Sequence, residues 1–128
     1  MGIQVNEYYE LLALHRALME AKFVDVARSP EVSGSPFVAR LARRVVQSLM
    51  ELEEGRKGAL GQHEWTRWLQ MDSNRREWQV ALNRTREYSD WSYLSHDERL
   101  TIAGDLLAPF EVTEEQLLEF VTESLEGL

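Results

Sequence analysis

All four tryptophans of the chain fall between His63 and Tyr93, and this clustering constrains the fold more than any other feature. Tryptophan is the largest side chain and is highly buried on average, so a stretch this rich in it belongs near a core. Apolar residues in the stretch recur every three or four positions, which is the spacing of one face of an α-helix. We therefore predict that the stretch supplies the middle of an all-α core.

The stretch contains two helical faces that do not line up. Trp65 and Trp68 lie on one face, but at about 100° per residue Trp78 falls well away from the line that they define. Between them lies Asp72-Ser73-Asn74, a group of residues that favours helix caps over helix interiors. Two interpretations stay open, namely two helices separated at this point or one helix that bends here.

Core packing is the simplest role for the tryptophans, and an aromatic pocket between helices is the alternative. The residues that would line such a pocket are Tyr8, His15, Trp65, Trp68 and Trp78. His15 and Lys22 project into the apolar face of the first helix, where an unpaired polar group would cost stability. We expect His15 to bond to a carbonyl or hydroxyl, and Lys22 to lay its stem on the core with its ammonium in water.

The remaining patterns predict one all-α domain, residues 1–128, built as a bundle of five helices, or six if the tryptophan stretch is broken. Besides that stretch, helices are expected after Asn6, the predicted N-cap, to about Arg28, from Pro36 to about Glu54, after Ser95 as far as Pro109, and after Thr113 as far as Gly127. Ser35-Pro36 is typical of a helix start, and Ser95 and Thr113 each open a capping box. The three glycines in 55–61 predict a flexible loop, which lacks the residues of a phosphate-binding loop.

Each amphipathic helix also predicts which of its residues are buried. The second helix is expected to bury Phe37, Leu41, Val45, Leu49 and Leu52, and the last helix Leu117, Leu118, Val121 and Leu125. These sets recur at i, i+3 and i+4, the spacing of a buried helical face.

The negative charge is concentrated at one end of the chain. Residues 1–92 hold 13 basic and 13 acidic residues, whereas residues 93–128 hold nine acidic residues and only Arg99, so the whole net charge of −8 lies there. An acidic protein repels phosphate, and we therefore expect no nucleic-acid partner. A helix-turn-helix regulator would have to read DNA with Arg40, Arg43 and Arg44, and is the weakest hypothesis.

Four acidic residues of the last helix share its outer face: Glu115, Glu119, Glu123 and Glu126. Like charges at i, i+4 each destabilise an isolated helix by roughly 0.2–0.5 kcal/mol, so something is expected to face them. Inside the chain the candidates are Arg40, Arg43, Arg44, Arg75, Arg76 and Arg84. Outside it, the candidate is a partner with a basic surface.

No residue pattern indicates catalysis, a metal or another cofactor, and we expect none of them. None of the three histidines has a second His or a Glu three or four residues away, so no helical metal half-site is present. The chain has no cysteine, no basic and apolar leader at its start, and no apolar run near the roughly 20 residues of a membrane span. These features predict a cytoplasmic protein without a membrane segment. The excess of arginine over lysine is a hint of a bacterial source.

The leading functional prediction is a small protein–protein interaction module of the adaptor, immunity-protein or specialised-chaperone type. It follows from the missing chemistry and from the acidic last helix. The alternative is a small-molecule binding domain that uses the aromatic pocket. A symmetric homodimer is expected separately, because 44% of the residues are hydrophobic and an apolar face could remain uncovered.

Overall fold

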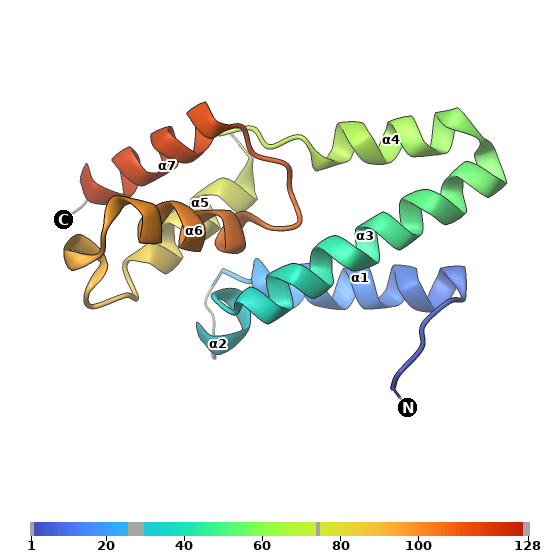
Figure 1. Ribbon diagram of the computed structural model, residues 1–128, viewed down its shortest axis with the longest axis horizontal. Coiled ribbons are helices and arrows are strands. Elements are labelled where there is room, and N and C mark those ends of the chain that lie inside the picture. Colours follow the sequence, from blue (N-terminus) through green and yellow to red (C-terminus); the bar gives the residue numbers. More distant parts are fainter. Residues whose placement is uncertain (1, 26–29, 74, 127–128) are drawn as a thin grey trace.

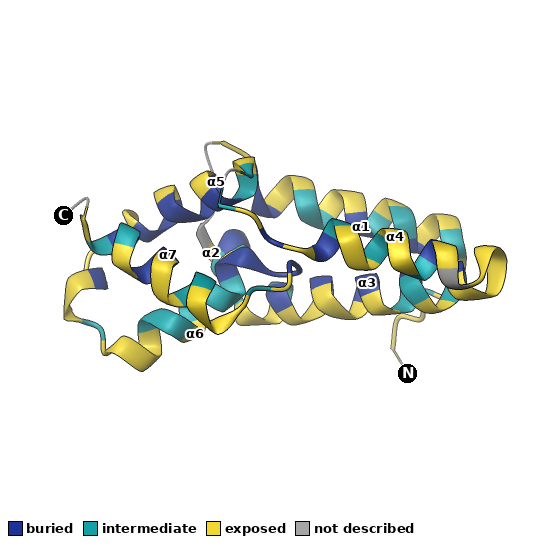
Figure 2. Cartoon of the chain, turned by 90° about the horizontal axis from the view of Figure 1, so that it is seen from above, coloured by how far each residue is buried: buried dark blue, intermediate teal, exposed yellow. Residues whose placement is uncertain are grey.

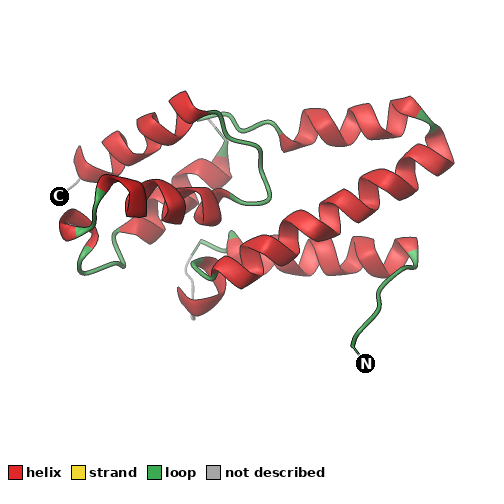
Figure 3. Ribbon diagram, in the orientation of Figure 1, coloured by secondary structure: helices red, strands yellow, loops and turns green. Residues whose placement is uncertain are grey.

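The computed structural model describes residues 2–25, 30–73 and 75–126, and within these ranges the regular elements are helices (Figures 1 and 3). They are α1 Tyr8–Lys22, α2 Pro30–Ser33, α3 Pro36–Lys57, α4 Ala59–Leu69, α5 Arg76–Thr85, a 3-10 turn Trp91–Tyr93, α6 His96–Leu107 and α7 Glu114–Glu126. The predicted all-α class is confirmed. The tryptophan stretch is two helices, α4 and α5, separated by the cap-rich segment; Asn74 of that segment lies outside the described residues.

The predicted capping residues are confirmed at three helices and wrong at the first. Ser35 caps α3, Ser95 forms a capping box with Glu98, and the Thr113 hydroxyl accepts from the backbone of Gln116 at 3.1 Å. At α1 the cap is Glu7 instead of Asn6, because its carboxylate accepts from two free backbone N–H groups of the first turn. This helix ends at Lys22, earlier than the predicted Arg28, which lies outside the described residues.

The predicted flexible loop at 55–61 is wrong, because α3 and α4 form a tight helical hairpin there. Gly58 alone joins the two helices, with a φ of +67° that favours glycine. Gly61 lies inside α4, where an added Cβ would be 3.1 Å from the carbonyl oxygen of Glu53. The glycines therefore serve one sharp connection and one close helix approach instead of a mobile segment.

The helices form two halves with separate buried clusters. In the first half, α3 packs along both α1 and α4, around Leu11, Val45 and Leu49 (Figures 1 and 2). In the second half, α6 packs on α5 and α7, and the cluster includes the fully buried Trp78 and Phe120. Trp91 is also buried, whereas Trp65 and Trp68 are half-buried. The tryptophan stretch thus supplies the core of the second half and one surface of the first.

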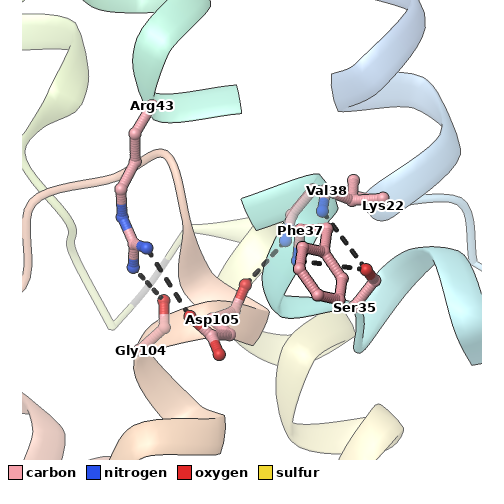
Figure 4. A network of polar contacts seen from close by, with 7 residues as sticks. All are labelled: Lys22, Ser35, Phe37, Val38, Arg43, Gly104 and Asp105. Carbon is pink, nitrogen blue, oxygen red and sulfur yellow. Dashed lines mark hydrogen bonds and ion pairs between the residues drawn. The ribbon is translucent and has the colours of Figure 1, made fainter. Parts of the chain in front are cut away.

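Side-chain cations from one half bind main-chain carbonyls of the other. Lys22 of α1 is 1% exposed and donates from Nζ to the carbonyl oxygen of Asp105 on α6 at 2.6 Å (Figure 4). Arg43 of α3 donates to the carbonyl of Gly104 at 3.0 Å and pairs with the Asp105 carboxylate at 3.5 Å. The expectation that the Lys22 ammonium lies in water is wrong, because α6 covers it. Burial lowers the pKa of Lys22 to about 8.

Two arginines of α5 make the same kind of contact with the C-terminal end of α1. Arg76 donates to the carbonyl oxygen of Phe23 at 2.7 Å, and Arg84 donates to the carbonyl oxygens of Val24 and Asp25. Phe23 is the C-cap residue of α1, and Val24 and Asp25 follow it, so these cations lie near the negative end of the helix dipole, where positive groups are favoured. These contacts position α5 against α1.

Three apolar residues that were expected inside are at the surface. Phe37 is 71% exposed, Leu41 39% and Leu118 42%. In α3 the buried face is turned toward Ala39, Ala42 and Val46, since small residues allow α3 to pack between its neighbours. In α7 the buried face includes Phe120, which is fully buried, instead of Leu118. Val45, Leu49 and Val121 are buried as predicted.

No described helix has the length and apolar character needed to cross a membrane.

Candidate functional site

A pocket of about 430 Å³ lies where α1, α3 and α4 meet. Its walls include Tyr8 and His15 from α1, Glu53 and Lys57 from α3, and Trp65 and Trp68 from α4. The three helices bring these residues together because α3 packs along both of the others. The pocket belongs entirely to the first half of the molecule.

The aromatic wall is a group of three rings in mutual edge-to-face contact. The ring centroids of His15 lie 5.2 Å from Trp65 and 5.1 Å from Trp68, and the two indoles are 5.5 Å apart. Such contacts are favourable and hold the rings in fixed orientations. Trp65 and Trp68 are three residues apart on α4, so both rings face α1 and reach its histidine.

His15 is neutral at physiological pH. Burial, with a smaller contribution from the nearby charge of Arg16, lowers its pKa to about 4. Its contacts among the described residues are with the two indole rings, where the sequence predicted a carbonyl or hydroxyl partner. A neutral imidazole in this wall does not repel a cation in the pocket.

Glu53 is the unusual polar residue of the site. It is 4% exposed, and one carboxylate oxygen, Oε1, accepts a hydrogen bond from the Tyr8 hydroxyl. That bond is the main reason why the pKa of Tyr8 is raised. The other oxygen, Oε2, is buried and has no hydrogen-bond donor among the described residues. A buried polar atom without a partner costs free energy, roughly 1–3 kcal/mol or more when it is charged.

The hairpin between α3 and α4 buries this carboxylate. An added Cβ at Gly61 would lie 3.2 Å from the Cβ of Glu53, which shows how closely α4 approaches it. Glu53 was not among the residues predicted for the pocket. A usable signal was present, since Glu53 follows Val45 and Leu49 at four-residue intervals on the buried face.

The structure brings four of the five predicted pocket residues together and places the fifth elsewhere. Tyr8, His15, Trp65 and Trp68 line the pocket. Trp78 is fully buried in the second half, where its ring packs edge-to-face on Phe120 at 5.2 Å. The break between α4 and α5 places Trp78 away from Trp65, whereas Trp68 also contacts the second cluster through Phe110, with the ring centroids 4.8 Å apart.

The predicted acidic face of α7 lies on the surface. Glu115, Glu119 and Glu126 are exposed, and the half-buried Glu123 accepts a weak hydrogen bond from Trp78 Nε1 at 3.4 Å. Within the described ranges none of the four forms an ion pair. Four of the arginines proposed as internal partners pair elsewhere: Arg43 with Asp105, Arg75 with Glu77, Arg76 with Asp25 and Arg84 with Glu87.

No group of three or more His, Asp or Glu side chains that suits a metal ion occurs in the part of the chain that the structure describes. Comparison of the chain with protein-family models, with curated proteins and with solved structures found no match.

Proposed function

We propose that this protein is a cytoplasmic binding protein whose α1–α3–α4 pocket takes a small organic cation, namely a protonated amine that carries an apolar or aromatic group. The observation that carries the proposal is Glu53, which lines the pocket and whose buried Oε2 has no donor among the described residues. An ammonium N–H would supply the missing donor and a compensating charge at once. Hydrogen bonds between ionised groups are among the strongest in proteins.

The rest of the pocket suits the same ligand. Trp65 and Trp68 give apolar contact, and aromatic faces attract cations by about 0.5–2 kcal/mol. The guanidinium of Arg56 already lies over the Tyr8 ring, 4.1 Å from its centre, so the two indoles are the faces left for a ligand. The neutral His15 adds no opposing charge. The wall holds two cations, Arg16 and Lys57, and two carboxylates, Glu53 and Glu64. Lys57 lies 4.0 Å from the carboxylate of Glu64. A volume of about 430 Å³ lies within the usual range for small-molecule sites.

The proposed role is binding without catalysis. The Tyr8 hydroxyl is already bonded to Glu53, and its raised pKa makes it a poor source of a proton or of a nucleophile at neutral pH. A bacterial source stays a prediction from the arginine-rich composition.

Phenethylammonium is a suitable probe, because it joins an ammonium to a single aromatic ring. We expect a saturable change in tryptophan fluorescence and NMR shifts for the indole N–H groups of Trp65 and Trp68. The matched neutral compound 2-phenylethanol has the same ring without the charge, and it is expected to bind at least about tenfold more weakly, a difference of about 1.4 kcal/mol. Equal responses to the two compounds would contradict a cation site.

A second arm of the test changes the protein. Glu53→Gln keeps the size of the side chain but removes its charge, and we expect the affinity for phenethylammonium to fall at least about tenfold. Glu54→Gln is the matched control, since Glu54 is the exposed neighbour on α3. A wild-type protein that gives no saturable response, or a Glu53→Gln protein that binds as the wild type does, would refute the proposal.

A second candidate function is the protein–protein interaction module, of the adaptor, immunity-protein or chaperone type, with the acidic face of α7 as its surface. The observation in its favour is that Glu115 and Glu119 flank the exposed Leu118 and form no ion pair within the described residues. Replacing Glu115, Glu119 and Glu123 by Gln separates the two roles of these charges. If the Gln variant is as stable as the wild type or more stable, the charges are available to a partner. If it is clearly less stable, the charges stabilise the fold.

A further inference from the structure

The first half of α3 carries an exposed stripe that combines apolar and basic residues. Phe37 and Leu41 are 71% and 39% exposed, and Arg40 and Arg44 lie beside them. The four positions are related by i, i+3, i+4 and i+7, so they form one continuous face, which we call the basic stripe. The Arg40 guanidinium lies 5.3 Å from the centre of the Phe37 ring. Within the described ranges, neither arginine forms an ion pair.

The outer face of α7 carries a stripe of the opposite charge with the same spacing. Glu115, Leu118 and Glu119 are related by i, i+3 and i+4, and Glu126 extends the same face by two further turns. Leu118 is 42% exposed between the two carboxylates. We call these four residues the acidic stripe.

We propose that the acidic stripe of one copy of this protein binds the basic stripe of a second copy. This inference rests on the second candidate function, and it names the partner of that surface. The basic stripe exposes Phe37 and Leu41, and the acidic stripe exposes Leu118. Each stripe also leaves charges of one sign without an ion pair inside the described molecule. The apolar side chains of the two stripes can pack together, and the charges that flank them are of opposite sign.

The neighbouring Arg43 supports the selection of these particular residues. It lies on the same helix between Arg40 and Arg44 in sequence, but its guanidinium is directed to Gly104 and Asp105 of α6 (Figure 4). The helix therefore divides its arginines between an internal contact and an outward face. The outward pair is the one left for a partner.

The association is expected to be weak and sensitive to salt, because exposed ion pairs contribute little each and are screened. Light scattering or sedimentation of the wild type at high micromolar concentration and low salt should give an average mass above that of the monomer. The excess mass should fall as salt is added. A wild-type protein that stays monomeric over this range would overturn the proposal.

Charge reversal tests which surfaces meet. A variant with Arg40→Glu and Arg44→Glu should be monomeric, and so should a variant with Glu115→Arg and Glu119→Arg. An equimolar mixture of the two should associate again, because the first keeps its acidic stripe and the second keeps its basic stripe. Failure of the mixture to associate, or association of either variant alone, would overturn the pairing of these stripes.

Matched controls keep the same change of charge at other exposed positions. Arg67→Glu on α4 and Glu54→Arg on α3 should leave the wild-type association within about twofold, because both residues are exposed and neither belongs to a stripe. The Gln variant of α7 separates the two hypotheses. A monomeric wild type with an equally stable Gln variant would refute self-association and leave α7 to another partner, whereas a destabilised Gln variant would refute both.

Discussion

His15 illustrates how the environment of one residue decides its chemistry. In the sequence it is a polar residue on an apolar helix face, and in the fold it is the third ring of an aromatic group with Trp65 and Trp68. Its burial lowers the pKa to about 4, so the folded protein holds a neutral imidazole where the unfolded chain, with a pKa near 6.5, takes up a proton more readily.

This difference predicts a dependence of stability on pH. Between pH 6.5 and about 4 the unfolded chain binds more protons than the folded one, so the free energy of unfolding should fall as the pH falls through this window. From pH 7 to pH 5 the contribution of His15 is roughly 1–2 kcal/mol, which allows for some solvent access through the pocket. Urea unfolding of the wild type and of His15→Phe at both pH values measures it.

The variant should lose less stability between pH 7 and pH 5 than the wild type does. His63→Gln is the control, because His63 is exposed and its replacement should preserve the wild-type dependence. Parallel behaviour of the wild type and His15→Phe would show that the histidine is not the source of the effect.

The role of a residue could be predicted when its partners are close to it in the sequence, and not when they are far away. The aromatic residues of the pocket were recognisable because size and helical spacing are local properties. The roles of Glu53 and Lys22 were not, because each depends on a covering helix. Gly61 brings α4 over the carboxylate, and α6 brings a carbonyl to the ammonium. The four-residue spacing of Glu53 after Val45 and Leu49 indicates its burial, but the sequence does not show which helix covers either residue.

At the scale of the elements, two glycines of the α3–α4 hairpin have opposite effects that a matched pair of substitutions can measure. Gly55 lies within α3 with open space around it, so Gly55→Ala should raise stability by about 0.5–1 kcal/mol through helix propensity. Gly61→Ala adds the same methyl group but places it 3.1 Å from the Glu53 carbonyl oxygen and 3.1 Å from the Lys57 Cβ. It should lower stability by about 1–2 kcal/mol despite the same gain in propensity.

Thermal unfolding of the two variants gives the comparison, and phenethylammonium binding adds a functional measurement. Since Gly61→Ala pushes α4 away from α3, it should also weaken binding in the pocket, whereas Gly55→Ala should not. An equal stabilisation by both substitutions would show that the hairpin has room to adjust.

The starts of α3, α6 and α7 were the best predicted part of the elements. Ser35, Ser95 and Thr113 cap helices as expected, because a cap depends on residues within one turn. The loop predicted at 55–61 was wrong because glycine has two uses, conformational freedom and close approach, and only the packed structure distinguishes them. The buried faces of α3 and α7 also differ from the predicted ones, so that Phe37 and Leu118 are exposed.

At the scale of the whole molecule, the arrangement into two halves was not predicted. The hydrophobic pattern predicted one bundle around the tryptophans. The structure has two buried clusters, and the chain passes from one half to the other at the break between α4 and α5. The halves are joined in part by cations that bind main-chain carbonyls, notably Arg84, which is 3% exposed and bonds to Val24 and Asp25. A backbone acceptor has no residue type, so no pattern in the sequence could reveal these contacts.

Arg84→Met tests how strongly this junction couples the halves. The substitution keeps an apolar stem but leaves the carbonyls of Val24 and Asp25 without their donor, and we expect a loss of about 2–3 kcal/mol in the free energy of unfolding. Urea unfolding followed by far-ultraviolet and near-ultraviolet circular dichroism measures it. Arg86→Met, at an exposed neighbouring position, should change stability by less than about 0.5 kcal/mol. Equal effects of the two would show that the junction contributes little.

The use of backbone carbonyls as acceptors also bears on how the chain can diverge. Every residue offers the same carbonyl oxygen, so positions 24 and 25 can accept many substitutions without removing the atom to which α5 is bonded. The donors have no such freedom, because only a long cationic side chain at positions 76 and 84 spans the gap. Related sequences should therefore vary more at positions 24 and 25 than at the arginines of positions 76 and 84.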